Sequence, residues 1–331
     1  MQSLYKEYTI MDKKVVVLTS GGDAPGMNAC LRAVVRLGLF NGIEIYGSHR
    51  GYQGLIDDDI ELLNSRSVSD IIQRGGTVLK TARCADFKTI EGIGKAVANL
   101  EKRGIKNVIA IGGDGTFRGG KDMSDNFDIN VIGIPGTIDN DLAYTDYTLG
   151  FFTAVDTVLW AINNLRDTMG SHDRCSLLEV MGRRCGDIAL YAGVCGGAEH
   201  ILVPEVPYDI DAIADSLKKS RERGKTSNMI VFAEGAGDKD AICAAITEKT
   251  GVKITTTTLG HIQRGGSPVM YDRLLATKMA ERAIELILVN AHNRVIGIKD
   301  NKIVDYNISE ALALPRSFDT KLYRMAGILG L

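Results

Sequence analysis

Several kinds of residue are scarce in this chain of 331 residues, and their scarcity excludes whole classes of protein. There are six cysteines and no CxxC pair, which argues against a zinc site and against a secreted disulfide framework. The start, MQSLYKEYTIMDKK, lacks the apolar core of a signal peptide, and no apolar run approaches the roughly 20 residues that span a bilayer. We therefore expect a reduced, cytoplasmic protein with no membrane partner, in which residues 1–12 precede the first strand as an extension.

Net charge is also nearly absent. The 39 basic and 41 acidic residues leave a formal charge of −2, so electrostatics gives no reason to expect a nucleic-acid partner. Hydrophobic residues make up 45% of the chain, which is enough for one large α/β unit or two domains of moderate size. Acidic small ligands stay compatible with this balance, because a local basic cluster can exist within a neutral total.

Glycine is abundant, with 37 residues, and many of them follow short apolar runs. Such runs predict buried strands, which alternate with amphipathic stretches that predict helices. Alternating strands and helices indicate parallel sheets covered by helices on both faces, and ligands of such sheets bind beyond the carboxyl ends of the strands. The expected strands are 14–19, 43–47, 107–111, 130–134, 176–180, 200–203, 229–233 and 255–259, with a hairpin at 295–298 and 302–304; the expected helices are 27–40, 90–102, 151–168, 210–223, 239–249 and 271–289.

Three motifs stand at predicted strand ends: GGDAPGMN from Gly21, GGDGT from Gly112, and PGTIDND from Pro135. Glycine turns before a helix suit phosphates, since the backbone approaches closely and free N–H groups point at the ligand. An aspartate among glycines suits Mg²⁺ beside phosphates, and paired carboxylates suit a general base beside a metal. Each motif also has a plain interpretation as a polar turn, and GGDGT also resembles the motif of NAD kinases and lipid kinases.

Taken together, the strings TSGGDAPGMNA, GGDGT, PGTIDND, EVMGR and GHIQRGGSP resemble the 6-phosphofructokinase family in order and spacing, over about residues 13–320. The resemblance, to the ATP-dependent bacterial members, implies two doubly wound Rossmann-like domains with mainly parallel sheets. It places an ATP/Mg-binding domain at 1–150 plus 263–313, and a sugar-phosphate-binding domain at 151–262 plus 314–331. The implied reaction is phosphorylation of fructose 6-phosphate at carbon 1 to fructose 1,6-bisphosphate, the committed step of glycolysis.

The resemblance also implies roles for individual residues. Asp139 is expected to act as the general base, Arg183 to stabilise the transition state, and Asp114 to hold Mg²⁺. The residues expected around ATP are Gly22, Arg83, Cys84, Gly113, Asp114, Gly115 and Thr116. Those expected around the sugar phosphate are Thr137 (also expected to be catalytic), Ile138, Asp139, Arg174, Met181, Gly182, Arg183, Glu234, His261 and Arg264, with Arg174 donated by a neighbouring subunit of a homotetramer. An effector site for ADP or phosphoenolpyruvate is expected at Arg32, Arg36, Arg166, Glu199 and Lys225.

The phosphate donor follows from two glycines. Family members that use pyrophosphate typically carry Asp at the position of Gly115 and Lys at the position of Gly136, where the larger side chains fill space that a nucleotide needs. Both positions are glycine here, so the resemblance implies ATP.

Three positions depart from the family pattern. Thr255 stands where bacterial members have an arginine that reaches the sugar phosphate across a subunit interface, which predicts weaker sugar affinity or a different acceptor. Ser65 stands where an effector-binding arginine is usual, which puts effector control in question, and Lys80 replaces a usual glycine. The alternatives are a related sugar-phosphate kinase with another acceptor, a weakly catalytic subunit that senses sugar phosphate and nucleotide, and an NAD or lipid kinase.

Overall fold

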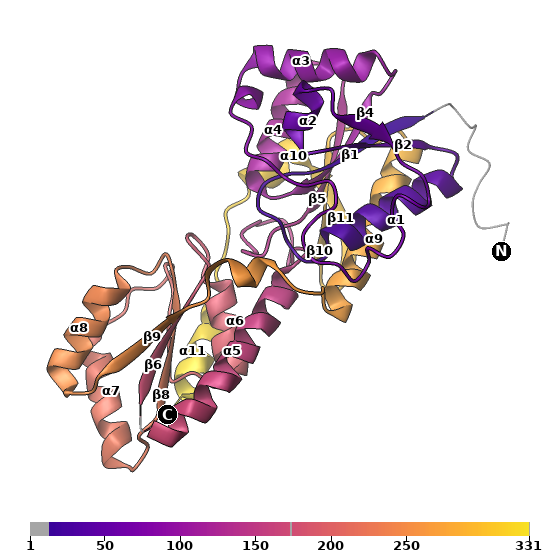
Figure 1. The fold of residues 1–331 in the computed structure, drawn as a ribbon. Coiled ribbons are helices and arrows are strands. Elements are labelled where there is room, and N and C mark those ends of the chain that lie inside the picture. Colours follow the sequence, from indigo (N-terminus) through magenta and orange to yellow (C-terminus); the bar gives the residue numbers. More distant parts are fainter. Residues whose placement is uncertain (1–12, 173, 331) are drawn as a thin grey trace. The chain divides into compact units, whose positions relative to one another are not determined.

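The computed structural model describes residues 13–172 and 174–330, which form two compact units (Figure 1). Unit 1 comprises Met1–Thr137, described from Lys13 onward, together with Leu142–Gly150 and Arg264–Pro315. Unit 2 comprises Ile138–Asp141, Phe151–Gln263 and Arg316–Leu331, of which Leu331 lies outside the described residues. The expectation for residues 1–12 also lies outside them.

Unit 1 is built on a seven-stranded sheet in the order β11-β10-β5-β4-β1-β2-β3. Its five central strands run parallel, and β3 and β11 pair antiparallel at the two edges. The strands are β1 Lys14–Thr19, β2 Glu44–Ser48, β3 Ile60–Leu62, β4 Asn107–Gly112, β5 Asn130–Pro135, β10 Arg294–Lys299 and β11 Lys302–Asn307. The apolar runs that predicted β1, β4 and β5 are buried on both faces, as parallel strands between helices must be.

Helices cover both faces of this sheet (Figure 1). On one face α1 packs against α9, and on the other α2, α3, α4 and α10 close a core that contains Phe117, Tyr52 and Leu100. The helices are α1 Met27–Phe40, α2 Tyr52–Ile56, α3 Ile90–Glu101, α4 Asp114–Asn126, α9 Met270–Leu288 and α10 Ile308–Ala313, with a 3₁₀ turn at Asp86–Lys88. The doubly wound arrangement expected from the alternating pattern is therefore confirmed for this unit.

Unit 2 contains a four-stranded, wholly parallel sheet in the order β7-β8-β6-β9. The strands are β6 Cys175–Val180, β7 His200–Leu202, β8 Asn228–Ala233 and β9 Ile254–Thr258; the helices are α5 Phe151–His172, α6 Asp187–Cys195, α7 Ile210–Glu222, α8 Lys239–Thr250 and α11 Thr320–Leu329, with a 3₁₀ turn at Gly260–Arg264 that runs on into unit 1. α7 and α8 close a core around Phe232 and Leu217 on one face, and α5, α6 and α11 belong to the other face (Figure 1). Among the helices of the described residues, none has the length and apolar character needed to cross a membrane.

The unit boundaries differ in detail from those expected. The whole of 1–150 was expected in the first domain, whereas Ile138–Asp141 belongs to unit 2. The reason is local bonding: the Asn140 side chain donates to Asp187 at 2.9 Å, and the Cys185 thiol donates to the carbonyl of Asn140 at 3.9 Å. Residue 263 lies in unit 2 rather than in the first domain, because the buried Gln263 side chain accepts from the backbone N–H of Met181; residues 314 and 315 fall in unit 1.

Candidate functional site

The motifs of unit 1 gather at the carboxyl edge of its sheet. β1 and β4 end in register, with Thr19 opposite Ile111, and β4 and β5 end with Gly112 opposite Pro135. The backbone N–H of Ser20 donates to the carbonyl of Ile111 at 3.0 Å, which ties the first glycine loop to the second. The GGDAPG, GGDGT and PGT segments therefore begin side by side, where a parallel sheet places its ligands.

The GGDGT segment forms the start of α4. Gly113 precedes the helix and Asp114 is its first residue, so the carboxylate lies at the positive end of the helix dipole. Thr116 is buried, and its carbonyl accepts a hydrogen bond of 2.7 Å from the Tyr52 hydroxyl. An added Cβ on Gly112 would lie 2.6 Å from the carbonyl oxygen of Ser20, so this position has room only for glycine. These contacts hold both ends of the turn, while Gly115 within it is exposed.

Gly115 and Gly136, the two glycines that imply ATP as the donor, differ in the space around them. An added Cβ on Gly115 would meet nothing within 4 Å among the described residues. At Gly136 it would lie 3.0 Å from the Ile111 side chain and 3.2 Å from the terminal methyl of Met27, so a larger side chain would fit only after these neighbours shift.

Gly22 lies against an arginine. A Cβ on Gly22 would collide with the guanidinium of Arg264, standing 2.9 Å from its Cζ, and Arg264 also donates to the carbonyl of Asp23 at 3.3 Å. The structure thus brings together a residue expected at ATP and one expected at the sugar phosphate. His261, expected beside Arg264 at the phosphate, belongs to unit 2 and is exposed.

The segment from Lys80 to Cys84 is partly exposed. Arg83 is exposed, and Cys84 packs against the core of unit 1, where burial raises the pKa of its thiol. Lys80 has φ +60°, a backbone conformation that glycine adopts without cost, which agrees with the glycine that the resemblance leads one to expect there. Its carbonyl accepts from the Thr19 hydroxyl at 3.0 Å, so the conformation also closes the loop onto β1.

In unit 2 the expected sugar residues follow the ends of β6, β8 and β9. Val180 lies opposite Ala233 and Glu179 opposite Thr258, so EVMGR, Glu234 and the GHIQ segment start at one edge. Gly182 has φ +132°, which favours glycine. Arg183 is exposed and its Nε lies 4.0 Å from the Glu234 carboxylate, a loose ion pair that a phosphate can replace.

The segment Ile138–Asp141 carries the expected base. Ile138 is buried, Asp139 is half-buried, and Asn140 is buried with φ +53°. Thr137 belongs to unit 1, where its carbonyl accepts from the Thr148 hydroxyl at 2.6 Å and its Cβ faces Gly113. The sequence did not reveal that Asn140 is held by Asp187, nor that Asp187 and Glu205 share Arg316.

Arg174 and Thr255 line one cavity of about 640 Å³ in unit 2. Three further cations line it, namely Arg221, Lys225 and Lys253, and its described lining contains no carboxylate. The cavity therefore has the charge to receive a phosphate, although Thr255 itself contributes none.

Three of the five expected effector residues meet in unit 2. The Glu199 carboxylate is buried, accepts from the backbone N–H of Met229 at 2.5 Å, and pairs with Lys225 at 2.9 Å and with Arg166 at 3.7 Å. Arg166 also donates to the carbonyls of Gly196 and Gly197. Arg32 and Arg36 lie one turn apart on α1 of unit 1, and Ser65 is exposed in the same unit.

The residues around Asp114 fit a magnesium ion that is bound chiefly by phosphates. Mg²⁺ keeps several waters and uses one or two protein carboxylates beside substrate phosphates. Asp114 offers one partly exposed carboxylate, now paired with Arg118 at 2.7 Å, and its neighbours Gly113 and Gly115 leave it uncovered. Among the described residues the cluster of three metal-ligating groups is elsewhere, at Cys185, Asp187 and Glu205.

Comparison with known proteins decides the family. Residues 14–287 match the family model described as Phosphofructokinase. The chain belongs to the phosphofructokinase family. This membership sets aside the interpretation of GGDGT as the mark of an NAD or lipid kinase.

Members of the family cover the chain almost completely. The chain is 56% identical over 317 residues to the ATP-dependent 6-phosphofructokinase of Clostridium tetani, with 96% of this chain and 99% of the relative covered. The enzyme of the same name from Clostridium botulinum is 54% identical over the same shares. The phosphofructokinase structure from Saccharomyces cerevisiae superimposes with a TM-score of 0.86 at 33% identity; it covers 96% of this chain, which spans 48% of the yeast chain.

Proposed function

We propose that this protein transfers the γ-phosphoryl group of ATP to the 1-hydroxyl of fructose 6-phosphate, as an ATP-dependent 6-phosphofructokinase in the glycolytic pathway. The observation that carries the proposal is the 56% identity, over 96% of the chain, to a relative of that name. The absence of a side chain at both 115 and 136, where a larger residue would take up space, supports ATP as the donor.

The proposed reaction is a displacement at the γ-phosphorus of ATP. The 1-hydroxyl oxygen attacks the γ-phosphorus, the bond from that phosphorus to the β–γ bridging oxygen breaks, and ADP leaves. The hydroxyl proton passes to the Asp139 carboxylate, and the Arg183 guanidinium stabilises the charge on the transferring group. Mg²⁺ held by Asp114 would neutralise phosphate charge in the same step.

Binding is assigned to the remaining residues by unit. In unit 1, Gly22, Arg83, Cys84 and the backbone of Gly113–Thr116 are assigned to the nucleotide, and Thr137 and Arg264 to the sugar phosphate. In unit 2, Ile138, Met181, Gly182, Glu234 and His261 are assigned to the sugar phosphate. Two of these, Gly182 and Glu234, start from the edge where β6 and β8 end, which supports their grouping.

Assembly and regulation extend the proposal. Arg174 is exposed and lines the basic cavity, so it is free to contact a phosphate, and it is assigned to the sugar phosphate of a neighbouring subunit in a homotetramer. An anionic effector such as ADP or phosphoenolpyruvate would compete with Glu199 for Lys225 and Arg166. Sedimentation velocity measures the oligomeric state and so tests the tetramer. A cytoplasmic location is proposed together with the glycolytic role.

A coupled assay tests the proposed reaction. With ATP, Mg²⁺ and fructose 6-phosphate, release of ADP and fructose 1,6-bisphosphate is expected. Pyrophosphate in place of ATP is expected to give no turnover. Absence of turnover with ATP at millimolar fructose 6-phosphate would overturn the proposal, and turnover with pyrophosphate would overturn the assignment of the donor.

A further inference from the structure

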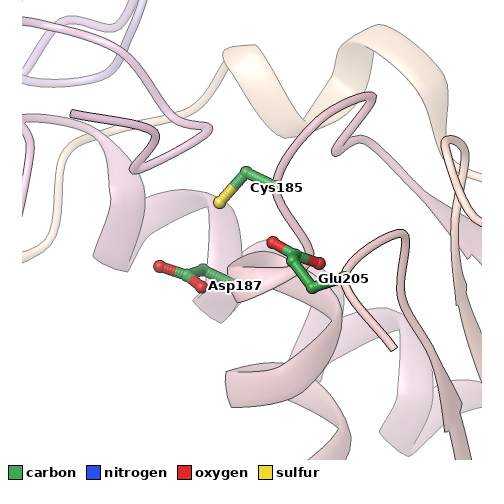
Figure 2. Close-up of side chains that lie close together, drawn as sticks. All are labelled: Cys185, Asp187 and Glu205. Carbon is green, nitrogen blue, oxygen red and sulfur yellow. The ribbon is translucent and has the colours of Figure 1, made fainter. Parts of the chain in front are cut away.

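Cys185, Asp187 and Glu205 lie together in unit 2, with their side chains directed at one another (Figure 2). One ligand atom from each lies within 4.8 Å of the others, an arrangement that resembles a metal site. The carboxylates already have a cation, however. The Arg316 guanidinium donates to Asp187 at 2.6 Å and to Glu205 at 2.5 Å.

The thiol does not complete a metal site either. Burial raises the pKa of the Cys185 thiol, and the thiol is directed at the carbonyl of Asn140, to which it donates. Only 13% of the Asp187 side chain, 16% of that of Glu205 and 21% of that of Arg316 are exposed. The cluster is therefore a mostly buried receptor for the guanidinium of Arg316.

Hydrogen bonds continue from this receptor to the segment that carries Asp139. The second oxygen of Asp187 accepts from the Asn140 side chain at 2.9 Å, and the Cys185 thiol donates to the carbonyl of Asn140 at 3.9 Å. Glu205 in turn accepts from the backbone N–H of Gly186 at 2.9 Å, which fixes the turn between Cys185 and Asp187. Arg316 is thus linked to Asn140 through a single side chain, that of Asp187.

The backbone of Asn140 needs such support. Its φ of +53° lies in the left-handed region, which residues other than glycine adopt uncommonly, asparagine more often than most, and which the surrounding contacts hold here. Asn140 directly follows Asp139, so with the Asn140 side chain anchored at Asp187 its φ sets the orientation of the peptide that joins it to Asp139. A change in the position of Asp187 is therefore transmitted to Asp139 through one residue.

We propose that Arg316 is a positioning residue for Asp139, acting through Asp187 and Asn140. The inference rests on the proposed function of Asp139 as the base. Catalytic groups must be held within about 0.5 Å of their working geometry, which requires supporting residues that are themselves fixed. Arg316 provides such support from the C-terminal segment, far along the chain from Asp139.

Two variants and their combination test the proposal. In Asn140→Gly the hydrogen bond from the side-chain amide to Asp187 is lost. Glycine adopts the left-handed backbone conformation at no cost, so the variant is expected to fold. In Arg316→Ala the two carboxylates lose their cation. Each is expected to lower kcat by about 100-fold, the effect of a displacement of about 1 Å, with the KM for ATP changed little. The double variant is expected to have the kcat of the less active single variant, because both substitutions break the same chain of hydrogen bonds.

A matched control is Arg282→Ala, which breaks a similar arginine–carboxylate pair with Asp305 in unit 1. It is expected to leave kcat unchanged. If Arg316→Ala does not fold, Arg316→Lys is used instead. The lysine keeps the charge but places it on one nitrogen, which does not reproduce the fork of the guanidinium, so an intermediate kcat is expected. A wild-type kcat in Asn140→Gly or in a folded Arg316 variant, or losses that multiply in the double variant, would overturn the proposal.

Failure of this proposal is distinguishable from failure of the proposed function. An inactive Asp139→Asn with a fully active Asn140→Gly would leave the base in place and remove the positioning role. An Asp139→Asn variant as active as wild type would remove the base itself, and with it the premise of the relay.

Discussion

The guanidinium of Arg264 occupies the space into which a side chain on Gly22 would project, with Cζ 2.9 Å from an added Cβ. Both residues belong to unit 1, although Arg264 is expected at the sugar phosphate and Gly22 at ATP. Arg264 is further held by the carbonyl of Asp23 in the same loop. The glycine therefore serves two ends: it leaves backbone open to a phosphate, and it leaves room for this arginine.

The variant Gly22→Ala tests this relationship. The new methyl group displaces the far end of a flexible side chain, so the fold is retained while Arg264 moves. We expect the KM for fructose 6-phosphate to rise by about tenfold, the loss expected when one charged hydrogen bond to phosphate weakens. Steady-state kinetics measures it, with Gly327→Ala, an exposed helical position with nothing within 4 Å, as control. An unchanged KM would show that Arg264 does not bind the sugar phosphate from this position.

The choice of donor is tested by Gly115→Asp combined with Gly136→Lys. Gly115 has open space, whereas at Gly136 the Cγ2 methyl of Ile111 and the terminal methyl of Met27, 3.0 and 3.2 Å from an added Cβ, must shift, so circular dichroism checks that the double variant folds. The added bulk should exclude the nucleotide, and we expect kcat/KM for ATP to fall by at least about 100-fold, more than 2.7 kcal/mol of transition-state binding. Initial rates with ATP and with pyrophosphate measure it. Retention of full ATP activity would contradict the role of the two glycines.

Thr255→Arg should strengthen the grip on the sugar phosphate. Thr255 lies on β9 and lines the same basic cavity as Arg174. A hydrogen bond to a charged group contributes about 1.5–3 kcal/mol, so we expect the KM for fructose 6-phosphate to fall by about tenfold or more. Ala244→Arg, at an exposed position of α8, adds the same charge to unit 2 as a control. If both variants behave like wild type, the missing arginine at 255 does not limit sugar binding.

The stability of unit 1 should depend on pH through Asp305. Burial alone would raise the pKa of this carboxyl, but hydrogen bonds from Arg282 and Arg294, at 2.8 and 2.6 Å, lower the pKa below its usual range. A lowered folded-state pKa stabilises the fold above the unfolded pKa of about 3.9, and this contribution is lost as pH falls through the folded value.

Asp305→Asn is therefore expected to unfold more easily than wild type by about 1–3 kcal/mol at pH 7, with the difference shrinking below about pH 4. Urea unfolding at several pH values measures the free energy of unfolding, and Glu281→Gln on the exposed side of α9 is the control. A difference that stays constant from pH 7 to pH 3 would show that the charge of Asp305 is not what stabilises the fold.

Much of the fold is predictable because buried parallel strands have a strong local pattern. The runs KVVVLT, NVIAI and NVIGI, each followed within two residues by glycine, predicted β1, β4 and β5 to within one residue. α4 was not predicted, since three glycines in DGTFRGGKDMSDN lower its helix propensity; burial of Phe117 and Met123 stabilises it instead. α6 was missed because it is apolar on nearly all sides and shows no helical periodicity.

The candidate site also contains residues that the sequence predicts and residues that it does not. Motifs at strand ends were predictable, because parallel strands bring their carboxyl ends to one edge whatever the intervening sequence. The Arg316 cluster was not, because a single arginine after a proline carries no local pattern and its partners lie 111 and 129 residues away along the chain. Only the folded structure shows that it supports the segment of Asp139.

The most direct test of the account is the turnover of Asp139→Asn with ATP and fructose 6-phosphate. The substitution keeps the size of the side chain and removes the ability to accept a proton. A general base contributes about 10²–10⁴-fold, so we expect kcat to fall by that factor while the KM for fructose 6-phosphate stays within about threefold of wild type. A kcat equal to that of wild type would contradict the account.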